Sequence, residues 1–290
     1  MRSLLFVPGD SEKKLEKGFA AGADVVIVDL EDSVAPDRKQ DARGIAAAFI
    51  AARRDGAAAS IYVRINELDG SAADADLAAV IAARPEGIML PKCNSSADLA
   101  RLAVKLRVHE AQAGLADGAT RIIAIMTETA RGLLAASTYQ QPMPRLAGLT
   151  WGAEDLSADI GARETRDASG RYTDVFRHAR AMTLLAATAT ESAAIDTVYV
   201  DFRDTAGLAA ECAEAERDGF TAKMAIHPAQ VPVINAAFTP SQAAVDAARA
   251  LVEAFAAAGN PGVVGIGGKM FDRPHLKRAE HLIARASSLG

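Results

Sequence analysis

Short apolar runs alternate along the chain with longer, Ala-rich segments of helical character. Eight of these runs predict β-strands, over residues 3–7, 25–30, 61–65, 87–90, 121–126, 146–151, 197–200 and 221–226. The segments between them mostly suit one helix each, as over 13–21, 38–54, 98–113 and 205–217. Continuously apolar strands that alternate with helices are typical of a buried parallel sheet. Eight such units in about 230 residues predict an α/β fold, a (β/α)8 TIM barrel, with an open doubly wound sheet as the alternative.

The pattern changes after the eighth run. Ser241 predicts the N-cap of a long helix over 242–258, a glycine-rich segment follows over 263–269, and a last helix is predicted over 274–287. We therefore predict that residues 1–240 form the barrel. Residues 241–290 are expected to form a C-terminal helical extension that carries a mobile glycine-rich lid. No low-complexity linker precedes the extension, so both parts are expected to form one structural unit.

Charged side chains follow most of the predicted strands. In a barrel these positions meet at the carboxyl ends of the strands, where active sites of this fold lie. Neighbouring carboxylates repel one another, and a divalent cation relieves that repulsion. Oxygen ligands without a Cys or His cluster favour a hard ion such as Mg²⁺. The side chains concerned are Asp29, Glu31, Asp32, Arg64, Lys92, Glu128, Asp155, Asp201, Asp204 and His227.

Each of these residues also has a structural interpretation. Glu128 and Asp155 both precede a predicted helix, where an acidic side chain interacts favourably with the helix dipole. Arg64 can form a salt bridge with Asp29 or Glu31 that serves the fold alone. His227 could instead be a helix-start residue, and Lys92 could be a solvated or structural lysine.

Composition narrows the functional classes. The chain has 290 residues, of which 50% are hydrophobic and 24% charged, so it is globular rather than disordered. A net charge of −5 argues against a nucleic-acid partner, and no apolar stretch approaches the length of a membrane helix. Two cysteines and a short first apolar run that ends at Pro8 predict a cytoplasmic protein without a secretory signal. The sequence motifs of P-loop, Rossmann, serine hydrolase and zinc peptidase sites are missing.

Nine short motifs occur in an order that resembles a known family. The chain is similar throughout its length to the citrate lyase β-subunit and malyl-CoA lyase family, the HpcH/HpaI aldolase/citrate lyase group. The segment 195–204 looks closest to its stand-alone β-like branch, which includes citramalyl-CoA lyase. The motifs lie at residues 5–9, 29–32, 63–66, 90–92, 128–130, 152–156, 219–221, 226–228 and 268–272.

The resemblance implies a barrel, usually trimeric, that makes or breaks a carbon–carbon bond beside a CoA thioester. It implies that Glu128 and Asp155 bind Mg²⁺, that Arg64 holds the substrate, and that Asp272 is the catalytic acid and base. It also implies contacts with CoA from Phe6, Lys13, Lys17, Ile226 and His227. The chain departs from the family pattern at two positions, where Phe6 replaces a common tyrosine and Ala222 a common glycine.

The expected function is an Mg²⁺-dependent lyase or condensing enzyme. It would act on a citramalyl-, malyl- or citryl-CoA type thioester and give acetyl-CoA and a 2-oxo acid, with neither nucleic acid nor membrane as a partner. Three alternatives remain. The first is an aldolase that acts on free hydroxy-oxo acids. The second is a citrate lyase β-subunit that acts on an acyl carrier protein. The third, disfavoured because every expected site residue is present, is a non-catalytic binding protein.

Overall fold

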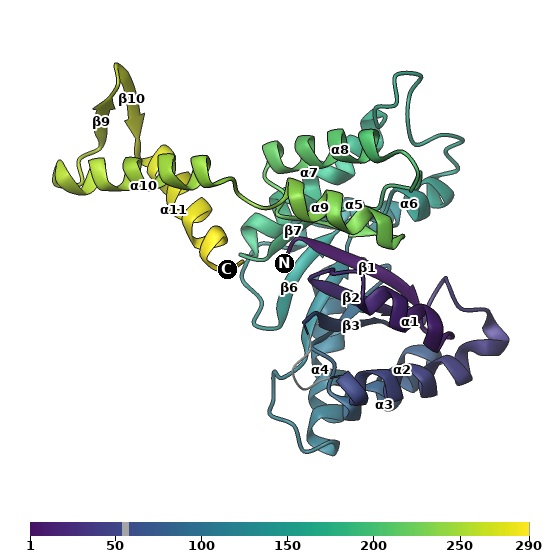
Figure 1. Ribbon diagram of the computed structural model, residues 1–290. Coiled ribbons are helices and arrows are strands. Elements are labelled where there is room, and N and C mark those ends of the chain that lie inside the picture. Colours follow the sequence, from purple (N-terminus) through teal and green to yellow (C-terminus); the bar gives the residue numbers. More distant parts are fainter. Residues whose placement is uncertain (54–57, 290) are drawn as a thin grey trace. The chain divides into compact units, whose positions relative to one another are not determined.

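Eight parallel strands close a barrel in the computed structural model, which describes residues 1–53 and 58–289 (Figure 1). Neighbouring strands follow one another in sequence, and the first pairs with the last. This topology confirms the predicted TIM barrel. The strands are β1 (Ser3–Pro8), β2 (Val25–Asp29), β3 (Ser60–Arg64), β4 (Gly87–Leu90), β5 (Arg121–Ile125), β6 (Leu146–Thr150), β7 (Ala193–Asp196) and β8 (Ala222–Ala225).

Helices follow the strands, and polar side chains begin several of them. Ser11 Oγ accepts a hydrogen bond from Lys14 N, and Thr129 Oγ1 accepts one from Gly132 N, so each side chain satisfies a backbone donor that the helix leaves free. The helices of the barrel and its last connection are α1 (Glu12–Phe19), α2 (Lys39–Arg53), α3 (Ser71–Val80), α4 (Ser96–Gln112), α5 (Ala130–Leu134), α6 (Ala153–Ile160), α7 (Asp174–Ala189), α8 (Thr205–Asp218) and α9 (Val231–Ala237). Short 3₁₀ helices lie at η1 (Pro36–Arg38), η2 (Ile81–Ala83), η3 (Ala136–Thr138) and η4 (Pro228–Gln230).

Most predicted boundaries agree with these elements to within a few residues. The last residue of the helix predicted over 38–54 lies outside the described residues. Among the residues that the structure describes, no helix combines the length and the apolar character that crossing a membrane requires.

The barrel interior is filled by apolar side chains from alternate strand positions. The opposite strand faces are also buried, as at Leu5, Val26 and Val63. Burial on both faces explains why the strands read as continuous apolar runs. The interior cluster consists of Leu4, Val25, Ile27, Tyr62, Met89, Ile123, Ile125, Ile195, Ala222 and Met224.

The seventh strand was predicted wrongly. We predicted it over 197–200, whereas β7 is Ala193–Asp196 and pairs with β6 and β8. The β-branched and aromatic residues of 197–200 have the higher strand propensity, but Val200 is 55% exposed. The small side chains of Ala193–Asp196 fit the barrel wall instead. The carboxylate at this strand end is therefore Asp196, and Asp201 lies in the following loop.

Asp196 anchors a buried cluster of charges that joins three strands and two helices. Its carboxylate accepts hydrogen bonds from Trp151 Nε1 at 2.8 Å, Arg180 Nε at 3.1 Å and Lys223 Nζ at 3.0 Å. Lys223 Nζ also donates to Glu211 at 2.8 Å. Burial alone would raise the pKa of Asp196, but the charges of Lys223 and Arg180 hold that pKa below its ordinary value. The carboxylate therefore stays ionised inside the protein.

The remaining residues form a second compact unit that begins at Ala236. It contains α10 (Gln242–Ala257), β9 (Val263–Ile266), β10 (Lys269–Asp272) and α11 (Arg273–Ser287), with a small core that includes Phe255, Val264 and Leu276. The structure divides after Asn235, five residues before the predicted boundary after residue 240. Whether both parts form one structural unit stays a prediction.

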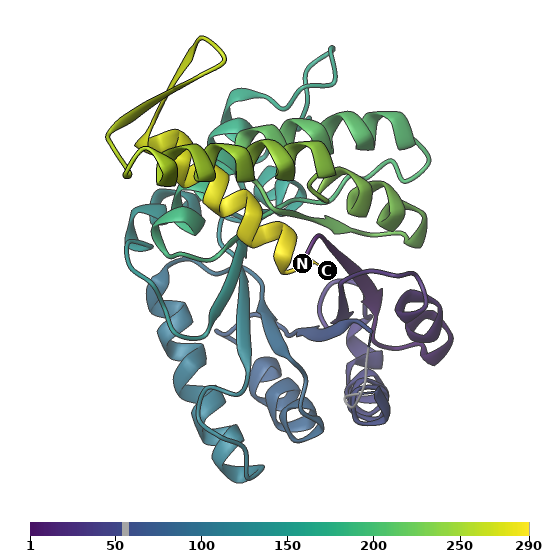
Figure 2. The same cartoon turned by 60° about the vertical axis from the view of Figure 1, so that its left-hand side comes forward.

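The glycine-rich segment forms an antiparallel hairpin of β9 and β10 (Figure 2), and its expected role as a mobile lid stays a prediction. Gly267 and Gly268 occupy its turn with φ values of 55° and 78°. Two consecutive positive φ values are what a tight two-residue hairpin turn requires, and glycine adopts them without strain. The glycines therefore form a defined turn.

We predict that Lys223→Met lowers the free energy of unfolding by about 3 kcal/mol, because it removes one of the cations that neutralise buried Asp196. Urea unfolding followed by circular dichroism measures the change. The control is Arg217→Gln, which breaks the exposed ion pair between Arg217 and Asp218 and should cost less than about 1 kcal/mol. Equal effects of the two substitutions would contradict this account of the cluster.

Candidate active site

A cavity of about 400 Å³ opens at the carboxyl ends of the barrel strands. Five predicted site residues line it together: Phe6, Arg64, Glu128, Asp155 and Ile226. They come from β1, β3 and the segments after β5, β6 and β8, so the closed barrel brings distant parts of the sequence to one place. The remaining lining residues are Pro8, Asp29, Asp32, Ser33, Ile125, Gly152, Ala153, Glu154, Thr197, Val198 and Met224.

Arg64 is held rigidly at the wall of this cavity. Its Nε and Nη2 donate to the two oxygens of Asp29 at 2.7 and 2.6 Å, and its Nη1 lies 3.0 Å from Glu31 Oε2. The guanidinium group also lies 4.8 Å from the centre of the Phe6 ring. Arg64 thus forms the salt bridges with Asp29 and Glu31 that its structural interpretation predicted. The same contacts fix the orientation of the guanidinium group at the cavity wall.

The Arg64 contacts also set the charge of Asp29. Burial alone would raise the pKa of this carboxyl group, but hydrogen bonds from Arg64 and its positive charge bring the pKa below the ordinary value. Asp29 therefore stays ionised, and the pair carries no net charge toward the cavity.

Lys92 connects the carboxylates at this end of the barrel. Its ammonium group is ion-paired with Glu31 and lies 3.5 Å from Asp155 Oδ1, while its backbone N–H donates to Glu128 Oε2 at 2.5 Å. The residue has a φ of 48°, in the left-handed region that a side chain disfavours. Such backbone strain is typical of functional sites. The sequence marked Lys92 only as a residue after a strand, and the solvated-lysine alternative is wrong.

Among the carboxylates at this end of the barrel, Glu128 has the negative charge that is least neutralised by neighbouring cations. Its residue is 3% exposed, and burial together with the charge of Asp155 raises its pKa to about 8. Gly152 allows this packing, since a Cβ there would lie 2.7 Å from Glu128 Cγ. The glycine before Glu154 and Asp155 thus makes room for the Glu128 side chain.

This arrangement fits a hard divalent cation. Glu128 and Asp155 both face the cavity, and their mutual repulsion is what a cation between them would relieve. Within residues 1–53 and 58–289, no three His, Cys, Asp or Glu side chains gather as a ready-made metal site. Two carboxylates suffice for Mg²⁺, which takes one or two of them and keeps several waters.

The other predicted CoA contacts lie outside the cavity lining. Lys13 and Lys17 are exposed on α1. His227 begins η4, where its Nδ1 accepts a hydrogen bond from Ala229 N, and its ring stacks on Phe202 with the ring centres 4.6 Å apart. His227 therefore begins a helix, as its structural interpretation predicted. The expected contacts of these three residues with CoA stay predictions.

Asp272 belongs to the second unit. It is the N-cap of α11, and its carboxylate is hydrogen-bonded to His275. The hydrogen bond from His275 lowers the pKa of this exposed carboxyl group. Its expected role as acid and base stays a prediction, and the capping role also holds.

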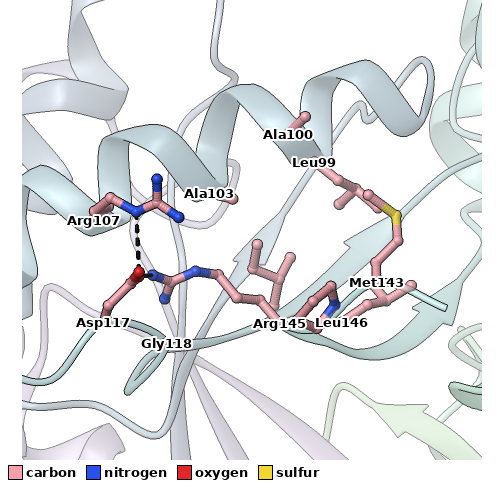
Figure 3. Close-up of a pocket in the computed structure, with 11 residues that line it drawn as sticks. Leu99, Ala100, Ala103, Arg107, Asp117, Gly118, Met143, Arg145 and Leu146 are labelled. Carbon is pink, nitrogen blue, oxygen red and sulfur yellow. Dashed lines mark hydrogen bonds and ion pairs between the residues drawn. The ribbon is translucent and has the colours of Figure 1, made fainter.

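A second cavity, of about 430 Å³, lies at the opposite end of the strands, where Ile122 and Leu146 line it near the starts of β5 and β6 (Figure 3). Asp117 accepts from Arg107 Nε at 3.1 Å and from Arg145 Nη2 at 2.5 Å. Arg145 also donates to both oxygens of Glu110 at 2.7 Å, so two carboxylates neutralise the two arginines. Active sites of barrels lie at the carboxyl ends of the strands, so the first cavity is the candidate active site.

Comparisons with known proteins identify the family of this chain. Residues 2–228 match the HpcH/HpaI aldolase/citrate lyase family. The (3S)-malyl-CoA thioesterase of Cereibacter sphaeroides strain KD131 is 35% identical over 290 residues, which cover 99% of this chain and 95% of that protein. The mitochondrial citramalyl-CoA lyase of Mus musculus is 33% identical over 300 residues, with coverage of 99% and 86%. The chain therefore belongs to the HpcH/HpaI aldolase/citrate lyase family, as its motifs predicted.

A solved structure extends the likeness to three dimensions. The structure of CitE from Mycobacterium tuberculosis in complex with magnesium, acetoacetate and coenzyme A matches with a TM-score of 0.79 and 35% identity. The match covers 99% of this chain and 98% of that one. It confirms the barrel fold and shows that a protein of this architecture binds both a magnesium ion and CoA.

We predict that Mg²⁺ binding to the chain tightens as the pH rises to about 8. The cation binds ionised Glu128, whose pKa of about 8 means that a proton must leave first at lower pH. The dissociation constant should therefore fall about tenfold for each pH unit below 8 and level off above it. Titration calorimetry at several pH values measures this dependence. Between about pH 6 and about pH 8 the dissociation constant should therefore fall roughly a hundredfold. An unchanged dissociation constant over this range would contradict the prediction.

Proposed function

We propose that this chain is an Mg²⁺-dependent carbon–carbon lyase that cleaves a short 3-hydroxyacyl-CoA thioester to acetyl-CoA and a 2-oxo acid, and that it catalyses the reverse condensation. The substrate would be of the citramalyl-, malyl- or citryl-CoA type. One observation carries the proposal: buried Glu128 lies beside Asp155 in a cavity whose wall contains a rigidly held Arg64. The expected class of enzyme, a lyase that uses magnesium and CoA thioesters, is confirmed by the relatives and the solved structures.

The reaction requires negative charge to be stabilised on oxygen. In cleavage, the hydroxyl group of the substrate gives its proton to a base, for which we propose the Asp272 carboxylate. The carbon–carbon bond breaks, its electron pair moves to the acetyl thioester as an enolate, and the enolate carbon then takes that proton from Asp272. Mg²⁺ held by Glu128 and Asp155 would supply Lewis-acid stabilisation for oxygens of the oxo-acid half. Arg64 binds the same half, because its fixed planar guanidinium can donate to a carboxylate or to a developing oxyanion.

Lys92 and Glu31 position these groups. The Lys92 backbone N–H orients Glu128, and the Lys92 ammonium neutralises Glu31. Asp29 and Glu31 form close ion pairs with Arg64 and Lys92, whereas the Lys92 ammonium lies farther from Asp155, at 3.5 Å. Glu128 has no ion pair among the described residues, so Glu128 and Asp155 are the carboxylates that we assign to Mg²⁺.

Asp272 would transfer the proton at the acetyl carbon. Its lowered pKa keeps the carboxylate ionised, as a base must be to remove a methyl proton in condensation. The same group returns the proton to the enolate after cleavage. Asp272 ends the β9–β10 hairpin of the second unit, and we propose that it reaches the cavity of a neighbouring subunit in a homotrimer. The family resemblance supports this arrangement.

CoA would reach the cavity along its rim. Phe6 and Ile226 line the cavity, and the exposed Lys13 begins the helix after β1, at the same end of the barrel. With Lys17 and His227, these residues would contact the CoA moiety, and the lysines would meet its phosphates. Free buried thiols at Cys93 and Cys212 suit a reducing compartment, so we propose that the enzyme acts in the cytoplasm.

The proposed function is tested by incubating the chain with acetyl-CoA, Mg²⁺ and glyoxylate, pyruvate or oxaloacetate in turn. We expect one of these acids to give a new 3-hydroxyacyl-CoA, identified by mass spectrometry, and we expect EDTA to stop its formation. A free hydroxy diacid in place of the thioester would show that hydrolysis follows, as the name of the thioesterase relative implies for that protein. No product from any of the three acids would refute the proposal.

We predict that Asp272→Asn abolishes most exchange of acetyl-CoA methyl protons with deuterated solvent, measured with an unreactive oxo-acid analogue bound. Asn also caps helices well but is no base, so thermal stability and Mg²⁺ binding should persist. Wild-type exchange in the variant would contradict the role.

Mixing Asp272→Asn chains with Arg64→Ala chains tests whether Asp272 acts across subunits. Mixed trimers would contain some cavities with both groups, so activity should recover. No recovery would contradict the arrangement between subunits.

A further inference from the structure

The loop after β7 forms a turn that two aspartates hold in place. Asp201 Oδ1 accepts a hydrogen bond from Arg203 N at 3.0 Å. Asp204 caps α8 by accepting from Gly207 N at 2.8 Å, and it also accepts from the Tyr199 hydroxyl at 2.7 Å. Through these hydrogen bonds, both Asp201 and Asp204 stabilise the turn. The side chains of the two residues between the aspartates take no part in these hydrogen bonds.

These two side chains point away from the core. Phe202 is 40% exposed, and Arg203 is also exposed. The Arg203 guanidinium lies 5.6 Å from the centre of the Phe202 ring and makes no other side-chain contact among the described residues. A large aromatic ring held at the surface beside an unpaired cation is typical of a binding surface.

His227 completes this surface and connects it to the cavity. Its ring stacks on Phe202 with ring planes 23° apart. Because Nδ1 accepts a hydrogen bond from Ala229 N, the proton of the neutral ring lies on Nε2, which remains a donor. Ile226, the preceding residue, lines the active-site cavity. We call Phe202, Arg203 and His227 the aromatic platform.

We infer that the aromatic platform binds the nucleotide end of the CoA substrate. The adenine ring stacks against Phe202 and His227, and Arg203 and His227 Nε2 bind the phosphates. This inference rests on the proposed function and goes beyond it, because it assigns Phe202 and Arg203 to substrate binding. It also distinguishes between two carriers, since the phosphopantetheine arm of an acyl carrier protein has no base to stack.

The position of the platform supports this occupant. Phe202 follows β7, His227 follows β8 and Lys13 follows β1, and these three strands are neighbours in the barrel. An extended thioester whose acyl end lies in the cavity can therefore leave past Ile226 and place its nucleotide on the platform. Arg203 and Lys13 add positive charge on either side of that path.

The test uses the nucleotide fragment of CoA, adenosine 3′,5′-bisphosphate, and titration calorimetry on the full chain. Phe202→Leu should weaken its binding about tenfold, because stacking on one aromatic ring is lost, and Phe202→Tyr should retain it. Arg203→Gln should weaken binding about fivefold and make it less dependent on salt. Arg107→Gln is the matched control, since it removes an exposed positive charge at the opposite end of the barrel.

A kinetic comparison tests whether the platform also contributes to the reaction of acetyl-CoA. In condensation with the active oxo acid, Phe202→Leu should lower the ratio of kcat/KM for acetyl-CoA to kcat/KM for S-acetylpantetheine about tenfold. An unchanged ratio, or nucleotide binding equal in wild type and Phe202→Leu, overturns the inference while leaving the lyase intact. Nucleotide binding that depends on Phe202 in a chain that makes no product with any oxo acid supports the platform and refutes the proposed function.

Discussion

Repulsion among carboxylates at the carboxyl end of the barrel is the constraint on which the site depends. Asp29 and Glu31 are almost completely buried there, close to Glu128 and Asp155. Arg64 and Lys92 neutralise the first pair through short ion pairs. Among the described residues, no cation forms an ion pair with Glu128, and its pKa rises to about 8 as a result of burial and the charge of Asp155. A divalent cation removes this repulsion, so the chemistry of the site follows from its electrostatics.

The apolar barrel makes such a charged end possible. Its interior layers hold the strand ends at fixed positions, and the Asp196 cluster ties β7 and β8 to the helices that cover them. The loops after β7 and β8 therefore leave from a rigid wall. The loop after β7 lines the cavity through Thr197 and Val198 and carries Phe202 and Arg203 of the aromatic platform, while the loop after β8 carries His227. Asp196 thus lies in the buried cluster, and the next residue, Thr197, lines the cavity.

The sequence predicted much of this because periodicity and strand-end position are local signals. Continuous apolar runs identified seven strands, and residues directly after strands identified Arg64, Glu128 and Asp155. The seventh strand was missed because barrel closure favoured small residues over the β-branched residues of 197–200. Lys92 was undervalued because its contacts with Glu31 and Glu128 span long stretches of sequence. The hairpin of the glycine-rich segment was not predicted, because glycines permit both mobile segments and tight turns.

The central claim is that Glu128 and Asp155 together bind the catalytic divalent ion. Mn²⁺ can replace Mg²⁺ as a paramagnetic probe, and electron paramagnetic resonance measures how much of it is bound. The account predicts one bound Mn²⁺ per chain in the wild type, and none at the same free concentration in a Glu128→Gln, Asp155→Asn double variant that unfolds at the wild-type temperature. Equal binding of Mn²⁺ by a folded double variant would contradict the account.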